Sequence, residues 1–305
     1  MPGPLAESRD VVINAGSTID VARTLRDARI IDTALPFVMF VWATRSEGAL
    51  RAAEYRFPPG ATVPQVVSIL RTARPVEHLL TIPEGVTASQ VKAILDRTSW
   101  ASGSVDAITE GSILPETYAF ERGTPRTVIL SRAYKAMERE LQEAWASRDQ
   151  KLPLASPTEL LTLASIVERE TALPSERAKV AAVYLNRLRL GMKLQADPTV
   201  VYAASNGTGV LDRKLTKADL NQDSPYNTYR YPGLPPGPIC SPSAESLQAV
   251  AHPVDSADLF FVADGRGGHV FAQTAEAHFR NVARWRMMAQ PSPPSPTKNA
   301  SPTID

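Results

Sequence analysis

Apolar positions in the first hundred residues follow one pattern that occurs three times. It reads INAGSTIDVARTLRDA from Ile13, FPPGATVPQVVSILRTA from Phe57 and IPEGVTASQVKAILDRT from Ile82. Each copy has an apolar residue, then Gly-x-Thr, then apolar residues spaced three and four apart, as on one face of a helix. The pattern predicts three strand–turn–helix units.

The Gly-x-Thr step of each copy supplies the chemistry of a turn. The glycines permit a positive φ angle, and the threonines are candidate helix N-caps. These residues are Gly16, Gly60 and Gly85, and Thr18, Thr62 and Thr87. Any connection from a strand to a helix can carry a glycine and a cap residue. Three copies with one spacing favour a small α+β module of related units.

The clearest helix start in the chain is the sequence SPTE in the second half. It places Ser156 at the N-cap, Pro157 at the first helical position and Glu159 two positions later, which is a capping box with the favoured proline. The apolar spacing then predicts a helix as far as Glu170. Pro174 prevents its straightforward continuation.

Other segments are less regular. An amphipathic, charged helix is expected over about 125–148, and another from about Ser175, with Gly191 as its C-terminal stop. After Met192 the chain is rich in loops, with LFFVAD and HVFAQ as a hairpin joined by GRGG. A last helix is expected at about 274–288.

These elements predict an α+β protein with about two domains, given its 305 residues. We expect the following division: a flexible N-terminus (1–10), the small α+β module (11–100), a connecting segment (101–155), a mixed α/β domain (156–290) and a disordered Pro/Ser-rich tail (291–305).

Composition excludes several functional classes. The formal net charge is +1, and no basic stripe indicates nucleic-acid binding. Cys240 is the only cysteine, so no internal disulfide can form. The histidines are His78, His252, His269 and His278; none has a metal-motif spacing, so we expect no metal site. The longest apolar run, 35–43, is far shorter than the ~20 residues of a membrane-spanning helix. No signal peptide is visible.

Two carboxylates end the helix that begins at SPTE, with only Arg169 between them. Glu168 and Glu170 lie about 200° apart on a helix, at opposite margins of its apolar face. Desolvation and the negative end of the helix dipole would both raise the pKa of such a carboxyl, as a general acid requires. The alternative is an ordinary helix-end pair neutralised by Arg177 and Lys179.

The loops that follow favour a binding groove. NTYRYPGLPPGPI, residues 227–239, combines amide, hydroxyl and aromatic groups with a stiff proline stretch, which suits sugar recognition. The prolines can also serve only as a structural turn. His269 begins a strand of the hairpin and is a weaker site candidate.

Four stretches together resemble one family. They are EGSILPETYAF, LASIVERETALPSERAKVAAVYLNRLRLGMKLQADPTVVYA, YNTYRYPGLPPGPICSPS and FFVADGRGGHVFAQTAEAH. They keep the order found in the MltG/YceG-like endolytic murein transglycosylases and span about 80–285. The Gly-x-Thr units look like the N-terminal part of that family, which contains a LysM-like glycan-binding module. The resemblance therefore implies that 156–290 is the catalytic domain.

The resemblance also implies a reaction. Such enzymes cut peptidoglycan between N-acetylmuramic acid (MurNAc) and N-acetylglucosamine (GlcNAc) and leave a 1,6-anhydro end. A single glutamate acts first as acid and then as base, without metal or cofactor, and the acetamido group can replace the second carboxylate of other glycosidases. By motif position this glutamate is Glu170.

Further residues lie where the family motifs run through the substrate groove, and the resemblance implies that they bind substrate. They are Glu116, Glu168, Gln195, Asp197, Asn227, Thr228, Tyr229 and His269. Glu168 can instead be structural, and Asp197, which precedes Pro198, can instead fix a turn.

The resemblance implies a location at the periplasmic face of the bacterial inner membrane, with glycan strands as substrate and cell-wall synthases as possible partners. Relatives normally begin with a membrane anchor, and none is visible in this sequence; either the start is truncated or the anchoring differs. Two alternative functions remain: a non-catalytic peptidoglycan-binding scaffold, and a hydrolase acting on the same linkage.

Overall fold

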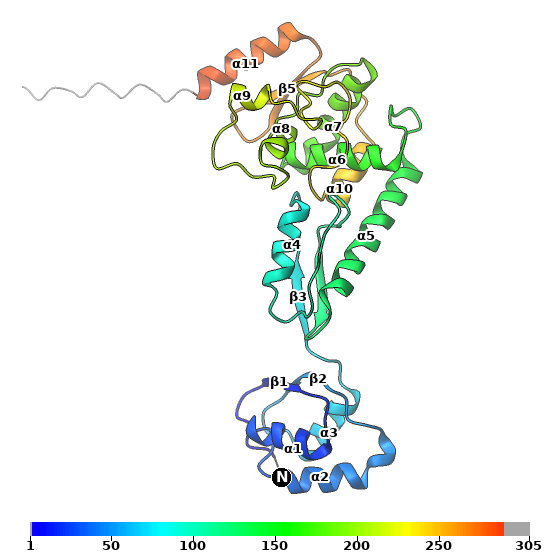
Figure 1. Cartoon of the computed structure of the whole chain (residues 1–305), viewed down its shortest axis with the longest axis vertical. Coiled ribbons are helices and arrows are strands. Elements are labelled where there is room, and N and C mark those ends of the chain that lie inside the picture. Colours follow the sequence, from blue (N-terminus) through cyan, green and yellow to red (C-terminus); the bar gives the residue numbers. More distant parts are fainter. Residues whose placement is uncertain (1, 290–305) are drawn as a thin grey trace, which may run out of the picture. The chain divides into compact units, whose positions relative to one another are not determined.

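The computed structural model describes residues 2–289 and contains both helices and strands, which confirms the expected α+β class. The chain forms two compact units. The first unit comprises the chain up to Pro83 together with 90–108 and 115–135; the second comprises 84–89, 109–114 and the chain from Ala136 onward. Figure 1 shows the elements in chain order.

The first unit holds the first two predicted strand–turn–helix pairs, and the strand and most of the helix of the third. Its elements are β1 (Arg9–Ile13), α1 (Thr18–Asp27), α2 (Ala34–Ala43), β2 (Ala53–Phe57), α3 (Val63–Thr72), β3 (Glu77–Thr81), most of α4 (Ala88–Arg97), β4 (Thr117–Glu121) and the start of α5 (Arg126–Ser147). β1 pairs antiparallel with β2, and β3 with β4. Apolar residues of β1, β2 and α1–α3 form one core.

The turn chemistry agrees with the sequence pattern at both the glycine and the cap of the second copy, and at the glycine of the third. Gly60 and Gly85 have φ angles of +62° and +69°, and Thr62 is the N-cap of α3. In the first copy, Gly16 does not have a positive φ angle, and the N-cap is Ser17 rather than Thr18. The cap lies one residue earlier because the Ser17 hydroxyl accepts the Asp20 N–H, while the Asp20 carboxylate accepts the Ser17 N–H.

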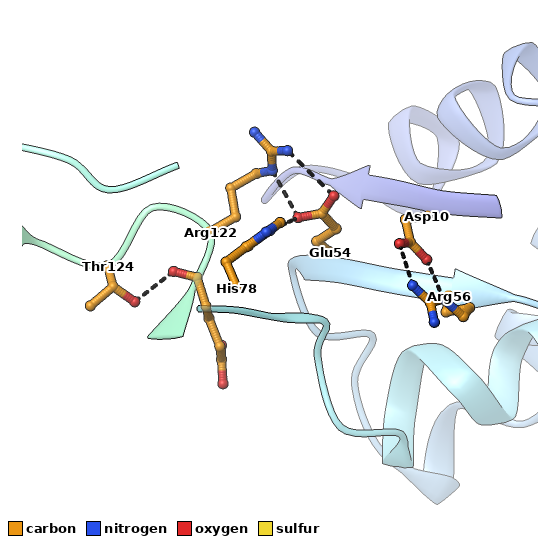
Figure 2. A network of polar contacts seen from close by, with 7 residues as sticks. Asp10, Glu54, Arg56, His78, Arg122 and Thr124 are labelled. Atoms are coloured by element: carbon orange, nitrogen blue, oxygen red, sulfur yellow. Dashed lines mark hydrogen bonds and ion pairs between the residues drawn. The ribbon is translucent and has the colours of Figure 1, made fainter. Parts of the chain in front are cut away.

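A polar network lies within the first unit. Figure 2 shows the Glu54 carboxylate between His78 and Arg122, with contacts of 2.6 and 2.9 Å. The hydrogen bond from Arg122 holds the pKa of buried Glu54 below its ordinary value. Asp10 and Arg56 pair across β1 and β2, so the N-terminus expected to be flexible already belongs to a strand at Arg9–Asp10.

The second unit is built around a buried helix. Its elements are the end of α5, α6 (Pro157–Glu170), α7 (Pro174–Arg189), α8 (Asp197–Ala204), α9 (Lys217–Leu220), α10 (Ala244–Ala251), β5 (Phe260–Ala263), β6 (His269–Ala272) and α11 (Ala275–Ala289). Every residue of α6 from Leu160 to Val167 is buried, and α7, α8 and α10 pack against this helix (Figure 1). β5 and β6 form the predicted hairpin.

Both ends of the α6–α7 pair follow the sequence signals. Ser156 caps α6 and accepts the Glu159 N–H, and Gly191 follows α7 with a φ angle of +64°. The short helices α8, α9 and α10 lie in the region expected to be mostly loops. α10 is held by packing, since its Leu247 and Val250 are fully buried, whereas the four-residue α9 has a capping box between Thr216 and Asp219.

The expected domain boundaries at 100 and 155 remain a prediction. The observed packing divides the chain differently, because 84–89 and 109–114 pack with the second unit, and α5 passes from one unit to the other at Lys135. The tail at 291–305, expected to be disordered, lies outside the described residues. In the part of the chain that the structure describes, no helix is long and apolar enough to span a membrane.

Gly111 provides a test of this packing. Its φ angle is +73°, and an added Cβ would overlap the ring of Pro238, whose own Cβ would be 2.7 Å away. We expect Gly111→Ala to lower the free energy of unfolding by about 3 kcal/mol, from backbone strain and overpacking together. Gly191→Ala adds a Cβ in open space at a similar φ angle and should cost about 1 kcal/mol. Urea unfolding measures the free energy of unfolding of each variant. Equal decreases in the two variants would contradict the predicted overlap with Pro238.

Candidate active site

Glu170 is the last residue of α6, and its carboxyl faces a cavity of about 270 Å³. Thr171 ends the helix in an extended conformation. The cavity is lined by Glu170, Tyr184, Arg187, Gln195, Asp197, Tyr229, Phe261 and His278. Four of these were expected in the site from the sequence: Glu170, Gln195, Asp197 and Tyr229.

A hydrogen bond from α7 orients the Glu170 carboxyl. The Tyr184 hydroxyl donates to Glu170 Oε1 at 2.6 Å, and Tyr184 itself is 1% exposed. Burial raises the pKa of Tyr184 well above its ordinary value, so its hydroxyl remains a donor at any physiological pH.

The environment of Glu170 favours its protonated form. Burial raises its pKa to about 7, and the negative charge of Asp197 acts in the same direction. The hydrogen bond from Tyr184 and the charges of His269 and Arg187 oppose this rise. Near neutral pH the carboxyl can therefore both donate and accept a proton.

The segment 195–197 forms one wall of the cavity. Gln195 has a φ angle of +50°, and Asp197 begins α8. The Thr228 carbonyl accepts the Gln195 N–H at 3.1 Å, and the Thr228 hydroxyl accepts the Ala196 N–H at 3.0 Å. The Tyr229 hydroxyl donates to Asp197 Oδ1 at 2.5 Å, which fixes the carboxylate in the wall.

Asn227 and Thr228 are buried and do not line the cavity. The Asn227 side-chain amide donates to the carbonyls of Leu220 and Gln222, and its Oδ1 accepts the Tyr229 N–H at 3.0 Å. Both residues were expected in the groove from the motif. In the structure they hold the backbone that carries the cavity residues.

Arg187 brings a buried cation to the cavity. It is 8% exposed, its Nε donates to the Leu259 carbonyl at 2.7 Å, and its Nη1 donates to the Leu194 carbonyl at 2.6 Å. Its guanidinium also lies 5.3 Å from the centre of the Phe260 ring. Burial lowers the pKa of Arg187 from its high ordinary value.

His278, from α11, lines the cavity as well. Its ring stacks on Phe260 at 5.1 Å, and its Nδ1 is buried without a hydrogen-bond partner in the described part of the chain. Burial, with a smaller effect from Arg187, lowers the pKa of His278. Both effects favour the neutral imidazole.

Glu168 has a different environment from Glu170. Its Oε1 pairs with Arg177 at 3.1 Å, and its Oε2 accepts the Ser243 N–H and hydroxyl at 2.8 and 2.6 Å. Arg177 also pairs with Glu84 at 2.9 Å. Glu168 does not line the cavity, and its contacts support the structural role left open from the sequence.

Glu116 and His269 also lie outside the set of cavity residues. Glu116 is exposed, belongs to the first unit and accepts the Ile82 N–H through its carbonyl. The ring Nδ1 of His269 lies 2.7 Å from the Glu176 carboxylate, and the backbone N–H of His269 donates to the same carboxylate at 2.9 Å. His269 thus ties β6 to the start of α7.

Sequence reasoning missed four cavity residues: Tyr184, Arg187, Phe261 and His278. Tyr184 and Arg187 lie three positions apart on a buried face of α7. Polar groups on an otherwise apolar helix face could have indicated from the sequence that both residues belong to a site. Phe261 and His278 come from separate elements, and no local pattern marks them. Among the residues that the structure describes, no group of three or more His, Cys, Asp or Glu could hold a metal ion.

Fold and cavity together define an α+β protein with one readily protonated carboxyl at a helix end, in a polar cavity with aromatic walls. The chain belongs to the YceG-like family, whose model matches residues 11–284. The family recognised from the sequence motifs is thereby confirmed.

Individual relatives agree with this assignment. An endolytic murein transglycosylase of Bacillus subtilis is 30% identical over 302 residues, which cover 88% of this chain and 82% of the relative. A protein of the same name from Streptococcus pneumoniae is 36% identical over 176 residues, but these cover only 32% of its length. The crystal structure of a YceG-like protein from Listeria monocytogenes has a TM-score of 0.56 at 30% identity, covering 90% of this chain and 98% of that chain.

The burial of Glu170 predicts a pH-dependent stability. The folded pKa of about 7 exceeds the ordinary 4.5, so the wild type loses stability as the pH rises from 4.5 through 7. Glu170→Gln has no such loss. We expect the stability of the variant relative to wild type to grow by roughly 2 kcal/mol over this window, less than the full shift implies because the Glu170 carboxyl lines a cavity that solvent can enter.

Urea unfolding at several pH values measures this difference. Glu168→Gln is the matched control, because it weakens the buried pair with Arg177 and should destabilise the protein at neutral pH. A constant difference between Glu170→Gln and wild type from pH 4.5 to 7.5 would show that the Glu170 carboxyl is not desolvated.

Proposed function

We propose that the protein is an endolytic murein transglycosylase that cleaves the MurNAc–GlcNAc linkage of nascent peptidoglycan and leaves 1,6-anhydro-MurNAc ends. The relatives that carry this name support the class of enzyme. The observation that carries the chemistry is the Glu170 carboxyl, whose pKa of about 7 makes it both an acid and a base near neutral pH.

Two proton transfers at one carboxyl complete the reaction. The protonated Glu170 donates its proton to the glycosidic oxygen as the bond from that oxygen to C1 of MurNAc breaks. The resulting carboxylate accepts the proton of the MurNAc C6 hydroxyl, whose oxygen bonds to C1. Glu170 ends protonated as it began, and no water is consumed.

The cavity supports this role in two ways. Tyr184 holds one carboxyl oxygen, which leaves the other oxygen free to face the substrate. Gln195, Asp197 and Tyr229 present an amide, a carboxylate and a hydroxyl from one wall, groups suited to bind sugar hydroxyl and acetamido groups.

A hydrolase is the second candidate, and Asp197 is the observation that favours it. A second carboxylate in the same cavity could activate a water molecule, as in two-carboxylate glycosidases. The Asp197 carboxylate, however, already accepts a hydrogen bond from the Tyr229 hydroxyl at Oδ1, so this oxygen is already engaged and less available to a water molecule. A non-catalytic scaffold gives no reason to desolvate Glu170.

We also propose four features that the family resemblance implies. They comprise a LysM-like glycan-binding role for the first unit, substrate contacts by Glu116 and His269, a location at the periplasmic face of the inner membrane, and cell-wall synthases as partners. The antiparallel β1–β2 pair with its surrounding helices is compatible with a small binding module.

Glu170→Gln tests the catalytic assignment. The variant cannot donate a proton, so release of anhydromuropeptides from uncross-linked glycan strands should fall at least about 10³-fold. Mass spectrometry of the products gives the reading, and Glu245→Gln, at an exposed site on α10, should match wild type. Undiminished anhydro products from Glu170→Gln would overturn the assignment. Wild-type products heavier by one water would instead identify a hydrolase.

Tyr184→Phe tests how the acid is tuned. Loss of the donor that lowers the pKa of Glu170 should raise this pKa by roughly 0.5–1 unit. Activity that needs the protonated form would then persist to higher pH, and the alkaline limb of kcat/KM would move up. Tyr202→Phe, which removes a hydroxyl that contacts Glu110 instead, should leave the profile in place. A downward shift in Tyr184→Phe would contradict the proposed donor.

A further inference from the structure

The first unit contains a second cavity, of about 410 Å³, that the proposed reaction does not use. Residues at the start of α1, the end of α2 and the 48–52 segment line it. Its lining includes Arg45, Arg51 and Arg71, and none of the described lining residues is acidic. The cavity is therefore suited to an anion.

Arg71 is the buried member of this set, with a side chain that is 5% exposed. Its two terminal nitrogens donate to the carbonyl and hydroxyl of Thr44 and to Glu47. Its Nε is buried and has no acceptor among the described residues. Glu47 is 64% exposed, so this single carboxylate neutralises the cluster only weakly.

The helix beside this cavity carries an exposed apolar face. α2 contains no charged residue, and Leu35, Met39 and Trp42 are 67%, 62% and 68% exposed. Their spacing of four and three places them along one side of the helix, while Phe37 is fully buried in the core of the first unit. α2 packs against α1 and α3 at the edge of the first unit (Figure 1).

Arg45 joins the apolar face to the cavity. It lines the cavity, and its guanidinium lies 4.8 Å from the centre of the Trp42 ring. A tryptophan beside an arginine, next to exposed aliphatic side chains, is the arrangement that proteins place at the boundary between lipid headgroups and acyl chains.

We propose that α2 and the arginine cavity bind the surface of an anionic phospholipid membrane. The phosphate of a headgroup enters the cavity, where arginine is the preferred partner of phosphate oxygens, and Leu35, Met39 and Trp42 enter the acyl boundary. Charge complementarity favours this occupant, since a purely apolar partner would leave the cationic cavity unused. The site is independent of the reaction proposed for the second unit.

Co-sedimentation of the full chain with vesicles tests the proposal. We expect binding to phosphatidylcholine vesicles that contain phosphatidylglycerol, and little binding to phosphatidylcholine alone. Arg45→Gln should weaken binding about 5-fold, and Arg45→Gln with Arg51→Gln about 25-fold, since each arginine near an anionic surface contributes about 1 kcal/mol. Arg45→Gln is also measured alone, because Arg51→Gln removes a hydrogen bond to the Ala73 carbonyl as well as a charge.

Matched controls separate the site from general effects of charge and hydrophobicity. Arg23→Gln with Arg26→Gln removes the same charge from exposed positions on α1 and should change binding less than about 2-fold. Met39→Ser with Trp42→Ser should weaken binding about 10-fold or more. Leu190→Ser, at a 63% exposed position of the second unit, should have no effect.

Three results would overturn the proposal. The first is equal binding to the two kinds of vesicle, and the second is equal loss in the α1 control and the cavity variants. The third is calorimetric binding of inorganic phosphate that depends on Arg45 and Arg51 while neither kind of vesicle binds. That result would make the cavity a site for a soluble anion.

Discussion

The candidate site of the second unit depends on one interaction, the hydrogen bond from Tyr184 to the buried carboxyl of Glu170. α6 is buried over Leu160–Val167, so its last residue cannot turn away from the protein without loss of that packing. A carboxyl fixed there must lose most of its hydration. Its partner is a neutral hydroxyl rather than a cation, and the result is a carboxyl that keeps its proton near pH 7.

Glu168, near the same end of α6, shows the environment of a carboxylate whose partner is a cation. Two residues earlier, a carboxylate of similar burial pairs with Arg177 and accepts two hydrogen bonds from Ser243. A carboxylate held by an ion pair and two hydrogen bonds serves packing. The two glutamates have different environments because α7 and the 237–243 segment bring different partners to them. The helix that carries both glutamates contributes little to this difference.

This contrast also explains how far the sequence could predict the structure. Signals carried by a few neighbouring residues predicted the elements well: Ser156 and Gly191 mark the ends of α6 and α7 as expected. The cap of α1 was displaced by one residue because Ser17 and Thr18 are both good caps, and only Ser17 meets Asp20. The helices α8 and α10 are short, and such helices depend on tertiary packing more than on their own residues.

The candidate site was predictable only in part, for the same reason. Glu170, Gln195, Asp197 and Tyr229 belong to motifs that the resemblance already placed in the groove, and they line one cavity. Asn227 and Thr228 belong to the same motif but face inward and hold its backbone. Nothing in a linear motif distinguishes a side chain that lines a cavity from one that supports its wall.

A buried ionisable group with little ionic compensation lies at each of the two proposed sites. In the second unit an acid is desolvated beside a neutral donor, at the cost of stability above the ordinary pKa of a glutamate. In the first unit a guanidinium is desolvated with one exposed carboxylate as its only ionic partner in the described structure. Each arrangement lowers the stability of the isolated protein, and each suits the ligand proposed for it: the desolvated carboxyl keeps the proton that a glycosidic oxygen would take, and the cationic cavity would take an anion. Stability alone would favour an apolar replacement at either position, so binding is the simplest physical reason for a chain to keep both.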